Sequence, residues 1–150
     1  MEITWKEKDW NAITRDELYS FSRLRINVFV VEQDCPYPEF DDKDQQSIHL
    51  WGEDNDGKTL VYLRIVNPGV SYPEVSIGRV VVDGFHRKEG LGRKIMIKAM
   101  DTVYRRFGKV PVRISAQEYL IEFYESLGFV VEGEGYLEDG IPHIEMLHTP

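Results

Sequence analysis

The chain has 150 residues, of which 42% are hydrophobic and 29% charged, a composition typical of one globular domain with its own core. Its net charge of −8 disfavours a nucleic-acid binder, because such a protein needs a basic surface. No apolar run approaches the ~20 residues that a membrane-spanning helix needs. Residues 1–10 lack a signal-peptide core, so we expect a cytoplasmic protein without a membrane partner.

The sequence contains one cysteine, Cys35, which allows no internal disulfide and no cysteine cluster for zinc. We therefore expect no bound metal. Cys35 precedes Pro36, where it is either a reactive thiol or a small apolar side chain near a turn. The second interpretation is favoured, because free cysteines usually behave as small buried apolar residues.

The N-terminal third predicts an edge strand, a helix and a loop. Residues 2–6 alternate weakly, as an edge strand does. Thr14 and Glu17 have the spacing of a capping box, so a helix is predicted to start there. Apolar residues then recur with helical spacing: Leu18, Phe21, Leu24, Val28 and Phe29. Residues 34–46 hold two prolines and five carboxylates and are predicted to form a loop.

The rest of the chain alternates strands with helices. We predict strands at residues 47–53, 59–66 and 74–83, a helix at 90–107, a strand at 110–115, a helix at 118–127, and strands at 129–134 and 142–147. Gly108 and Gly128 fit helix ends, and Asp139-Gly140 fits the final turn. This order predicts a mixed sheet with helices on it, an α/β or α+β fold in a single domain over residues 1–150.

The segment Arg87 to Gly92 lies between a predicted strand and a predicted helix. Glycines let a backbone approach phosphates closely, and the free N–H groups of a helix start bind anions. Basic residues are concentrated here in an otherwise acidic chain: Arg87, Lys88, Arg93 and Lys94. The alternative is a turn that serves tight packing alone. The segment is not a P-loop, because Gly-Lys-Ser/Thr is absent.

Two motifs carry a family resemblance. Arg87-x-x-Gly90-x-Gly92 after Val80-x-Val82 resembles motif A of the GNAT superfamily of N-acetyltransferases, and residues 123–129 resemble its motif B. Residues 25–33, 77–80 and 139–143 are similar to the bacterial ElaA branch of that superfamily. The resemblance covers essentially the full chain. It implies a GNAT-like, mostly antiparallel central sheet of about six to seven strands flanked by about four helices.

The resemblance also implies acetyl-CoA as co-substrate and a set of residues that bind it. The set comprises the backbone of Val80 and Val82, the pyrophosphate turn with Arg87, Lys88, Gly90, Leu91, Gly92 and Arg93, and the side chains of Gln117 and Tyr124. Gln117 replaces an asparagine of many relatives, and helix capping is its alternative role. The resemblance makes Tyr124 the proton donor to the CoA thiolate, whereas the alternative is a core aromatic; one side chain can do both.

The acceptor side is less defined, because the strand before motif A lacks the glutamate base of many relatives. Candidates for proton removal or substrate binding are Glu32, His49, Arg79, His143 and Glu145, and a solvated strand face is the alternative for each. Arg25 lies on the apolar stripe of the first helix and needs a partner, since an unpaired buried charge is costly. That partner is either Glu32 or a loop carboxylate, or else an acidic group of the acceptor.

The carboxylates of residues 36–46 either attract a cationic amine or form a solvated surface loop. Together these features predict transfer of an acetyl group from acetyl-CoA to a primary amine of a small molecule or peptide by direct attack. The alternative is a catalytically weak acyl-CoA-binding sensor or partner-binding module on the same fold. We expect a monomer or homodimer.

Overall fold

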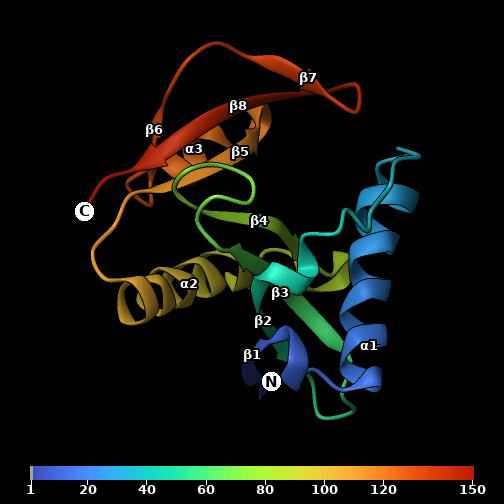
Figure 1. The fold of residues 1–150 in the computed structure, drawn as a ribbon. Helices are drawn as coiled ribbons and strands as arrows, with labels where there is room; N and C mark the ends of the chain where they lie inside the picture. The colour runs from blue at the N-terminus through green and yellow to red at the C-terminus, as the bar shows by residue number, and fades with distance from the viewer. Residues whose placement is uncertain (1) are drawn as a thin grey trace.

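Eight strands form one mixed sheet in the computed structural model, which describes residues 2–150 (Figure 1). The strand order is β1-β2-β3-β4-β5-β8-β6, and β7 pairs with β8. The strands are β1 (Thr4–Asp9), β2 (Ser47–Glu53), β3 (Thr59–Val66), β4 (Val75–Val82), β5 (Val112–Gln117), β6 (Val130–Val131), β7 (Tyr136–Glu138) and β8 (Ile141–His148). Only β4 and β5 pair in parallel, which confirms the predicted mixed, mostly antiparallel α/β (α+β) sheet.

In the part of the chain that the structure describes, three α-helices accompany the sheet: α1 (Arg15–Ile26), α2 (Leu91–Phe107) and α3 (Ile121–Glu125). The predicted capping box is present at the start of α1, because the Thr14 side chain accepts from the Glu17 amide while the Glu17 side chain accepts from the Thr14 amide. Beyond its C-terminus the chain continues in a wider π-helical turn, Asn27–Glu32. Among residues 2–150, no helix has the length and apolarity needed to cross a membrane.

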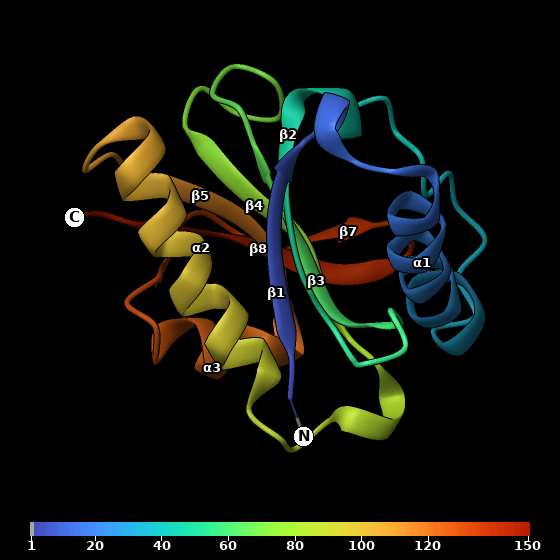
Figure 2. The same cartoon turned by 90° about the horizontal axis from the view of Figure 1, so that it is seen from below.

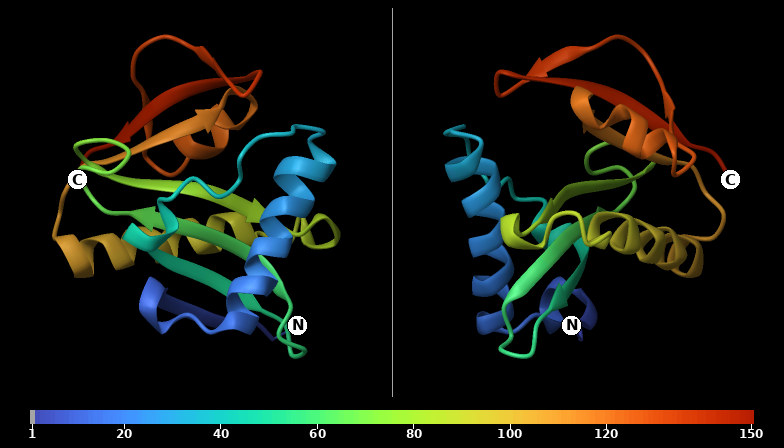
Figure 3. Two further views of the ribbon diagram at one scale, coloured as in Figure 1. Left: turned by 45° about the vertical axis from the view of Figure 1, so that its right-hand side comes forward. Right: turned by 180° about the vertical axis from the view of Figure 1, so that it is seen from behind.

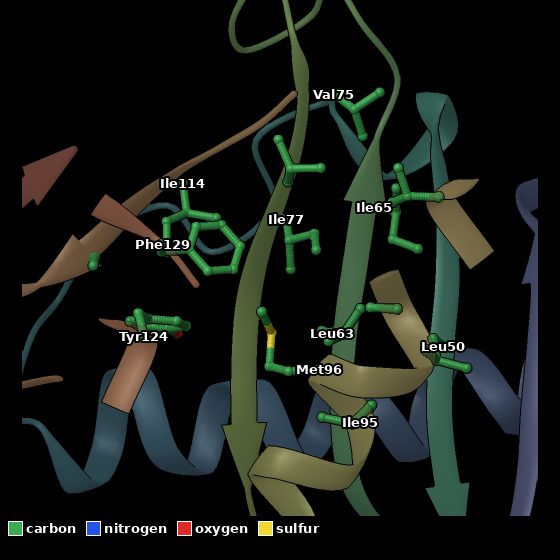
Figure 4. Close-up of a cluster of buried hydrophobic side chains, with 14 of the residues drawn as sticks. Leu50, Leu63, Ile65, Val75, Ile77, Ile95, Met96, Ile114, Tyr124 and Phe129 are labelled. Carbon is green, nitrogen blue, oxygen red and sulfur yellow. The ribbon is translucent and has the colours of Figure 1, made fainter. Parts of the chain in front are cut away.

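The two longer helices cover opposite faces of the sheet (Figure 2). Under α1 lies a small aromatic cluster that includes Phe21, Trp51 and Tyr62. The larger core lies on the α2 face, where Ile95 and Met96 pack with Leu63 of β3 (Figure 4). Tyr124 of α3 and Phe129 belong to the same core, as do Ile77 and Ile114 of β4 and β5. Burial on both faces therefore fixes β3 and β4 as central strands.

Several predicted boundaries are wrong in detail. The first strand runs from Thr4 to Asp9 rather than over residues 2–6, because it pairs with residues 48–53 of β2. The fold class is as predicted, although the sheet has eight strands and the fold three α-helices within residues 2–150, beside about six to seven and about four predicted. The predicted helix 118–127 is a 3₁₀ turn, Glu118–Leu120, followed by the short α3. The predicted strand 129–134 shrinks to β6, since β7 takes the place beside β8 instead.

Candidate active site

A cavity forms where the two parallel strands separate. β4 and β5 pair only near their N-terminal ends, with Val75 opposite Val112 and Ser76 opposite Arg113. Beyond these pairs the two halves of the sheet diverge (Figure 3). The resulting cavity of about 450 Å³ reaches α3, because Tyr124 also lines it. Its size is in the range of small-ligand sites, so the splayed sheet is the first candidate for chemistry.

A bulge in β4 brings backbone groups to this cavity. β3 pairs Tyr62 with Val81 but Arg64 with Gly78, so β4 contains one extra residue. Arg79 adopts a φ of +53°, a left-handed conformation that costs a non-glycine residue about 1–2 kcal/mol. Such a bulge interrupts the ladder of hydrogen bonds. Arg79 and Val80 have no partner in the β3–β4 register, and both residues line the cavity, so their backbone groups are available beside it.

The predicted phosphate turn opens α2. Gly90 precedes the helix with a φ of +76°, and no side chain caps it. The first helical bond runs from the Lys94 amide to the Gly90 carbonyl, 3.1 Å, so the three amides of residues 91–93 have no partner one turn earlier. A Cβ built on Gly90 would meet no atom within 4 Å. The helix start thus combines free donors, a positive dipole end and open space, which fits a pyrophosphate.

The basic residues of this turn are held in different ways. Arg87 forms an exposed two-pronged ion pair with Glu32, at 2.6 and 2.5 Å. Arg93 donates to the Ser126 hydroxyl at 2.5 Å and lies over the Phe123 ring, which ties the turn to α3. Lys88 is exposed with a φ of +74°. The side chain of Leu91 is buried in the core, so only its backbone amide is available at the helix start.

Tyr124 combines core packing with a polar end at the cavity. Its ring is 6% exposed and packs edge-on against Phe123 and Phe129, with centroids 5.1 and 6.0 Å away. No hydrogen bond to its hydroxyl is recorded within residues 2–150. Burial raises the pKa of the phenol above its usual value, so it stays protonated at neutral pH. A buried, protonated phenol that lines a cavity is suited to donating a hydrogen bond or a proton.

Of the predicted residues, five line the cavity together: Arg79, Val80, Gln117, Tyr124 and His143. Val82 ends β4 and packs against the core, and the glycine turn follows it. Glu145 faces Arg113, at 3.1 Å, outside the cavity lining. Glu32 belongs to the ion pair with Arg87. The candidates for the general base were Glu32, His49, His143 and Glu145. Of these four, His143 alone lines the cavity.

Arg25 and His49 lie instead in a buried cluster beside it. Arg25 is fully buried and pairs with Glu39 at 2.6 Å and Asp44 at 2.9 Å, so its partners are loop carboxylates and not Glu32. His49 is fully buried, with its Nε2 2.8 Å from the Asp44 carbonyl oxygen. Burial lowers the pKa of His49, which keeps it neutral. Neither side chain lines the cavity, and both serve packing.

The charged side chains of this region, which we call the arginine cluster, are Arg25, Arg64, Arg79, Glu39, Asp41 and Asp44. Arg64 bridges Asp41 at 2.5 Å and Asp44 at 2.9 Å. Burial opposes ionisation of Asp44, but Arg25 and Arg64 hold its pKa below the usual value. The loop carboxylates Glu39 and Asp44 are thus neither solvated nor free for an amine, and both earlier interpretations of this loop are wrong for them.

The opposite wall, formed by β5, β7 and β8, holds residues that the sequence did not single out. Ser115 and Tyr136 share a short hydrogen bond, and Ser115 also lies 3.4 Å from Glu138. Tyr136 stacks on His143, with which it is paired across β7 and β8. The Asp139-Gly140 turn was the sequence signal that could have pointed to these residues. A hairpin at this turn brings the residues on its two sides together.

Similar proteins are found with this architecture. The family model "Acetyltransferase (GNAT) domain" matches residues 17–149. A UPF0039 protein from Synechocystis is 40% identical over 147 residues, covering 98% of this chain and 96% of the relative. The crystal structure of Escherichia coli ElaA superposes with a TM-score of 0.91 at 37% identity, covering 98% of this chain and 99% of that one. The crystal structure of an acyl-CoA N-acyltransferase from Pseudomonas aeruginosa superposes with a TM-score of 0.94 at 41% identity. The match covers 99% of this chain and 100% of that one. These matches confirm the resemblance carried by the motifs.

Proposed function

Because the chain belongs to the GNAT acetyltransferase family, we propose that it moves an acetyl group from acetyl-CoA to a primary amine of a small molecule or peptide. The observation that carries this proposal is the cavity between β4 and β5. Val80, Gln117 and Tyr124 all line it, and we assign its chemistry to the Val80 backbone, the Gln117 amide and the Tyr124 phenol. These are the groups that hold a thioester and protonate its leaving thiolate.

The donor is a CoA thioester in this proposal. The amides of residues 91–93 bind its pyrophosphate, helped by the positive end of the α2 dipole. Lys88 and Arg93 add positive charge, and Arg87 does so once it leaves Glu32. The Pseudomonas relative is named an acyl-CoA N-acyltransferase and the family model an acetyltransferase. Both names support a CoA thioester, and we propose acetyl-CoA as the specific donor.

The chemistry is a direct attack of the amine on the thioester carbonyl. The amine must first lose a proton, because an ammonium group has no lone pair. Attack forms the carbon–nitrogen bond and a tetrahedral oxyanion, which backbone donors beside Val80 stabilise. Collapse breaks the carbon–sulfur bond and releases the CoA thiolate. Tyr124 gives its proton to this thiolate and regains one from the new amide nitrogen.

Because the pKa of Tyr124 is raised, the reaction depends on the proton that Tyr124 regains from the new amide nitrogen. A thiol has a pKa near ~8.5, so a phenol with a pKa above its usual ~10 is the weaker acid. Proton transfer to the thiolate is therefore uphill by itself. It becomes favourable when the phenolate is reprotonated by the cationic nitrogen of the product as that nitrogen becomes an amide. Tyr124 thus moves a proton from the amine to the thiolate.

Thermal unfolding with and without acetyl-CoA tests the donor half of this proposal. A ligand at 100 times its Kd stabilises the native state by about 2.7 kcal/mol, which raises the Tm of a protein of this size by roughly 5–10 °C. Desulfo-CoA keeps the pyrophosphate and should stabilise similarly, whereas acetyl-pantetheine should not. No shift with any CoA compound would refute the proposal. Binding without turnover on any amine would instead favour an acyl-CoA-binding module.

A further inference from the structure

In the corner of the cavity formed by β7 and β8, the His143 imidazole faces the Glu138 carboxylate, and with a neutral imidazole both facing atoms are hydrogen-bond acceptors. His143 is 7% exposed, and its Nδ1 lies 2.7 Å from the Ile141 carbonyl oxygen. A carbonyl oxygen only accepts, so Nδ1 must carry a proton. In the neutral imidazole the lone pair is therefore on Nε2. That atom lies 3.4 Å from the carboxylate oxygen Oε2 of Glu138.

Neighbouring groups hold this pair in place. The Tyr136 ring stacks on the His143 ring with centroids 6.3 Å apart and planes 25° apart. Ser115 donates toward the second carboxylate oxygen of Glu138, at 3.4 Å. A neutral Nε2 and a carboxylate both accept hydrogen bonds. An ammonium group satisfies them together, because it has three N–H donors and a positive charge.

The distribution of charge around the cavity also favours binding of a cation at this corner. Asp41 also lines the cavity, but Arg64 and Arg79 pair with it at 2.5 and 3.3 Å. Within the described chain, residues 2–150, no lysine or arginine lies within ion-pair distance of Glu138. The basic side chains Arg64, Arg79 and Lys43 belong to the wall of β3, β4 and the 34–46 loop. A cation that enters the cavity is therefore attracted to the β7–β8 corner.

We propose that Glu138 and His143 form the acceptor site for a cationic primary amine, and that His143 is the general base that deprotonates it. This inference rests on the proposed function. The ammonium nitrogen of the acceptor donates to Nε2 and to the Glu138 carboxylate. One proton passes to Nε2, which leaves the nitrogen lone pair free to attack the thioester carbonyl. The imidazolium then donates to Ile141 and Glu138, so both protonation states are satisfied.

The reaction balances with this assignment. The acceptor nitrogen starts with three protons and ends as an amide with one. His143 takes the first proton and returns it to solvent after product release. Tyr124 takes the second in place of the proton that it gives to the CoA thiolate. No oxidant, metal or further reactant enters the sequence.

The first test measures acceptor binding without turnover. n-Butylammonium is titrated into the CoA-bound protein, with n-butanol as neutral control, and the ¹H–¹⁵N signals of the histidine rings are followed. We expect the Nε2 signal of His143 to shift with n-butylammonium only, while the other three histidines serve as internal references. Glu138→Gln should weaken this binding about tenfold. Glu134→Gln, in the same segment and exposed, should leave it unchanged.

The second test measures the rate in single turnover, with acetyl-CoA bound and n-butylamine added. His143→Asn keeps a donor for the Ile141 carbonyl but removes Nε2. It should lower the rate about 100-fold or more while CoA affinity stays within twofold. If CoA binds but n-butylammonium leaves His143 unaffected, or His143→Asn retains its rate, the acceptor site is wrong and the proposed donor site stands. Failure of CoA to bind would instead refute the proposed function.

Discussion

The two walls of the cavity differ in how their charged side chains are paired. On the β3–β4 wall, the arginine cluster sets three guanidinium groups against three carboxylates, and most of these side chains are buried. On the β5–β8 wall, Glu138 is about half exposed, and among the described residues the group within ion-pair distance of it is the imidazole of His143 and no guanidinium. Charges that neutralise one another hold a loop in place. Charges left without a strong partner remain available to a ligand, so we assign stability to the first wall and propose that the second wall carries the chemistry.

Breaking the arginine cluster should give the largest effect. Arg25→Met leaves the Glu39 and Asp44 carboxylates buried beside one cation fewer, and loss of one partner of a buried ion pair costs about 3–5 kcal/mol. Urea unfolding measures this loss. Arg87→Met breaks the exposed pair with Glu32 and should cost at most about 1 kcal/mol. Equal losses in both variants would show that the cluster does not act as a buried unit.

Removing the phenol of Tyr124 should affect turnover alone. Tyr124→Phe keeps the packing against Phe123 and Phe129 but removes the proton donor, and loss of general acid catalysis lowers kcat about 100-fold or more. CoA affinity should change less than twofold. Tyr119→Phe is the matched control, because that ring is exposed on the preceding turn. A Tyr124→Phe protein with full turnover would assign the side chain to the core.

Glu17 tests the stabilising role of paired carboxylates away from the cavity. Burial opposes its ionisation, but Lys6, Lys8 and the Thr14 amide lower its pKa to about 2. Because the folded pKa is depressed, the stabilisation is fully present above the unfolded pKa near ~4.3 and is lost as pH falls toward 2. Glu17→Gln should therefore be about 2 kcal/mol less stable than wild type at pH 7.

This difference should shrink as pH falls from 4.5 toward 2, because protonated glutamate and glutamine are then alike in charge. Urea unfolding at a series of pH values measures it. The exposed Glu134→Gln should show no such pH-dependent difference from wild type. A constant gap between Glu17→Gln and wild type at all pH values would mean that the glutamine is destabilising through shape and not through charge.

The glycine turn should give the smallest effect, on affinity alone. Gly90→Val places a β-branched residue at a φ of +76° and sets a side chain beside the free amides of α2. We expect the Kd for CoA to rise about tenfold. Gly57→Val is the matched control, because its φ is +80° and its Cβ also meets open space. Both variants should lose similar stability, and isothermal titration should separate them. Equal affinities would place the pyrophosphate elsewhere.

Local sequence signals predicted the elements that form from neighbouring residues. The Thr14 capping box, the glycine start of α2 and the order of strands and helices all follow from short patterns. The bulge at Arg79 was not predicted, because it is defined by its pairing with β3, and the π-helical turn after α1 was not predicted either. Arg25 was recognised as needing a partner, but spacing alone did not select Glu39 and Asp44.

The candidate site divides in the same way. The proposed pyrophosphate turn lies in one continuous strand–turn–helix segment, and the motif predicted its residues. The acceptor side assembles β5, β7, β8 and the loop after α1, which are distant in sequence. Glu138 was missed because β7 itself was not predicted, and without that strand nothing brings its carboxylate to His143.

The central claim is tested most directly by turnover with the wild-type protein. Acetyl-CoA is incubated with a panel of primary amines, and the release of free CoA thiol is measured together with the mass of each amine. We expect thiol release that depends on an amine, with one acetylated amine formed for each thiol released. Cationic amines should react and neutral alcohols should not. Tight binding of acetyl-CoA with no acetylation of any amine would contradict the account and leave a CoA-binding module in its place.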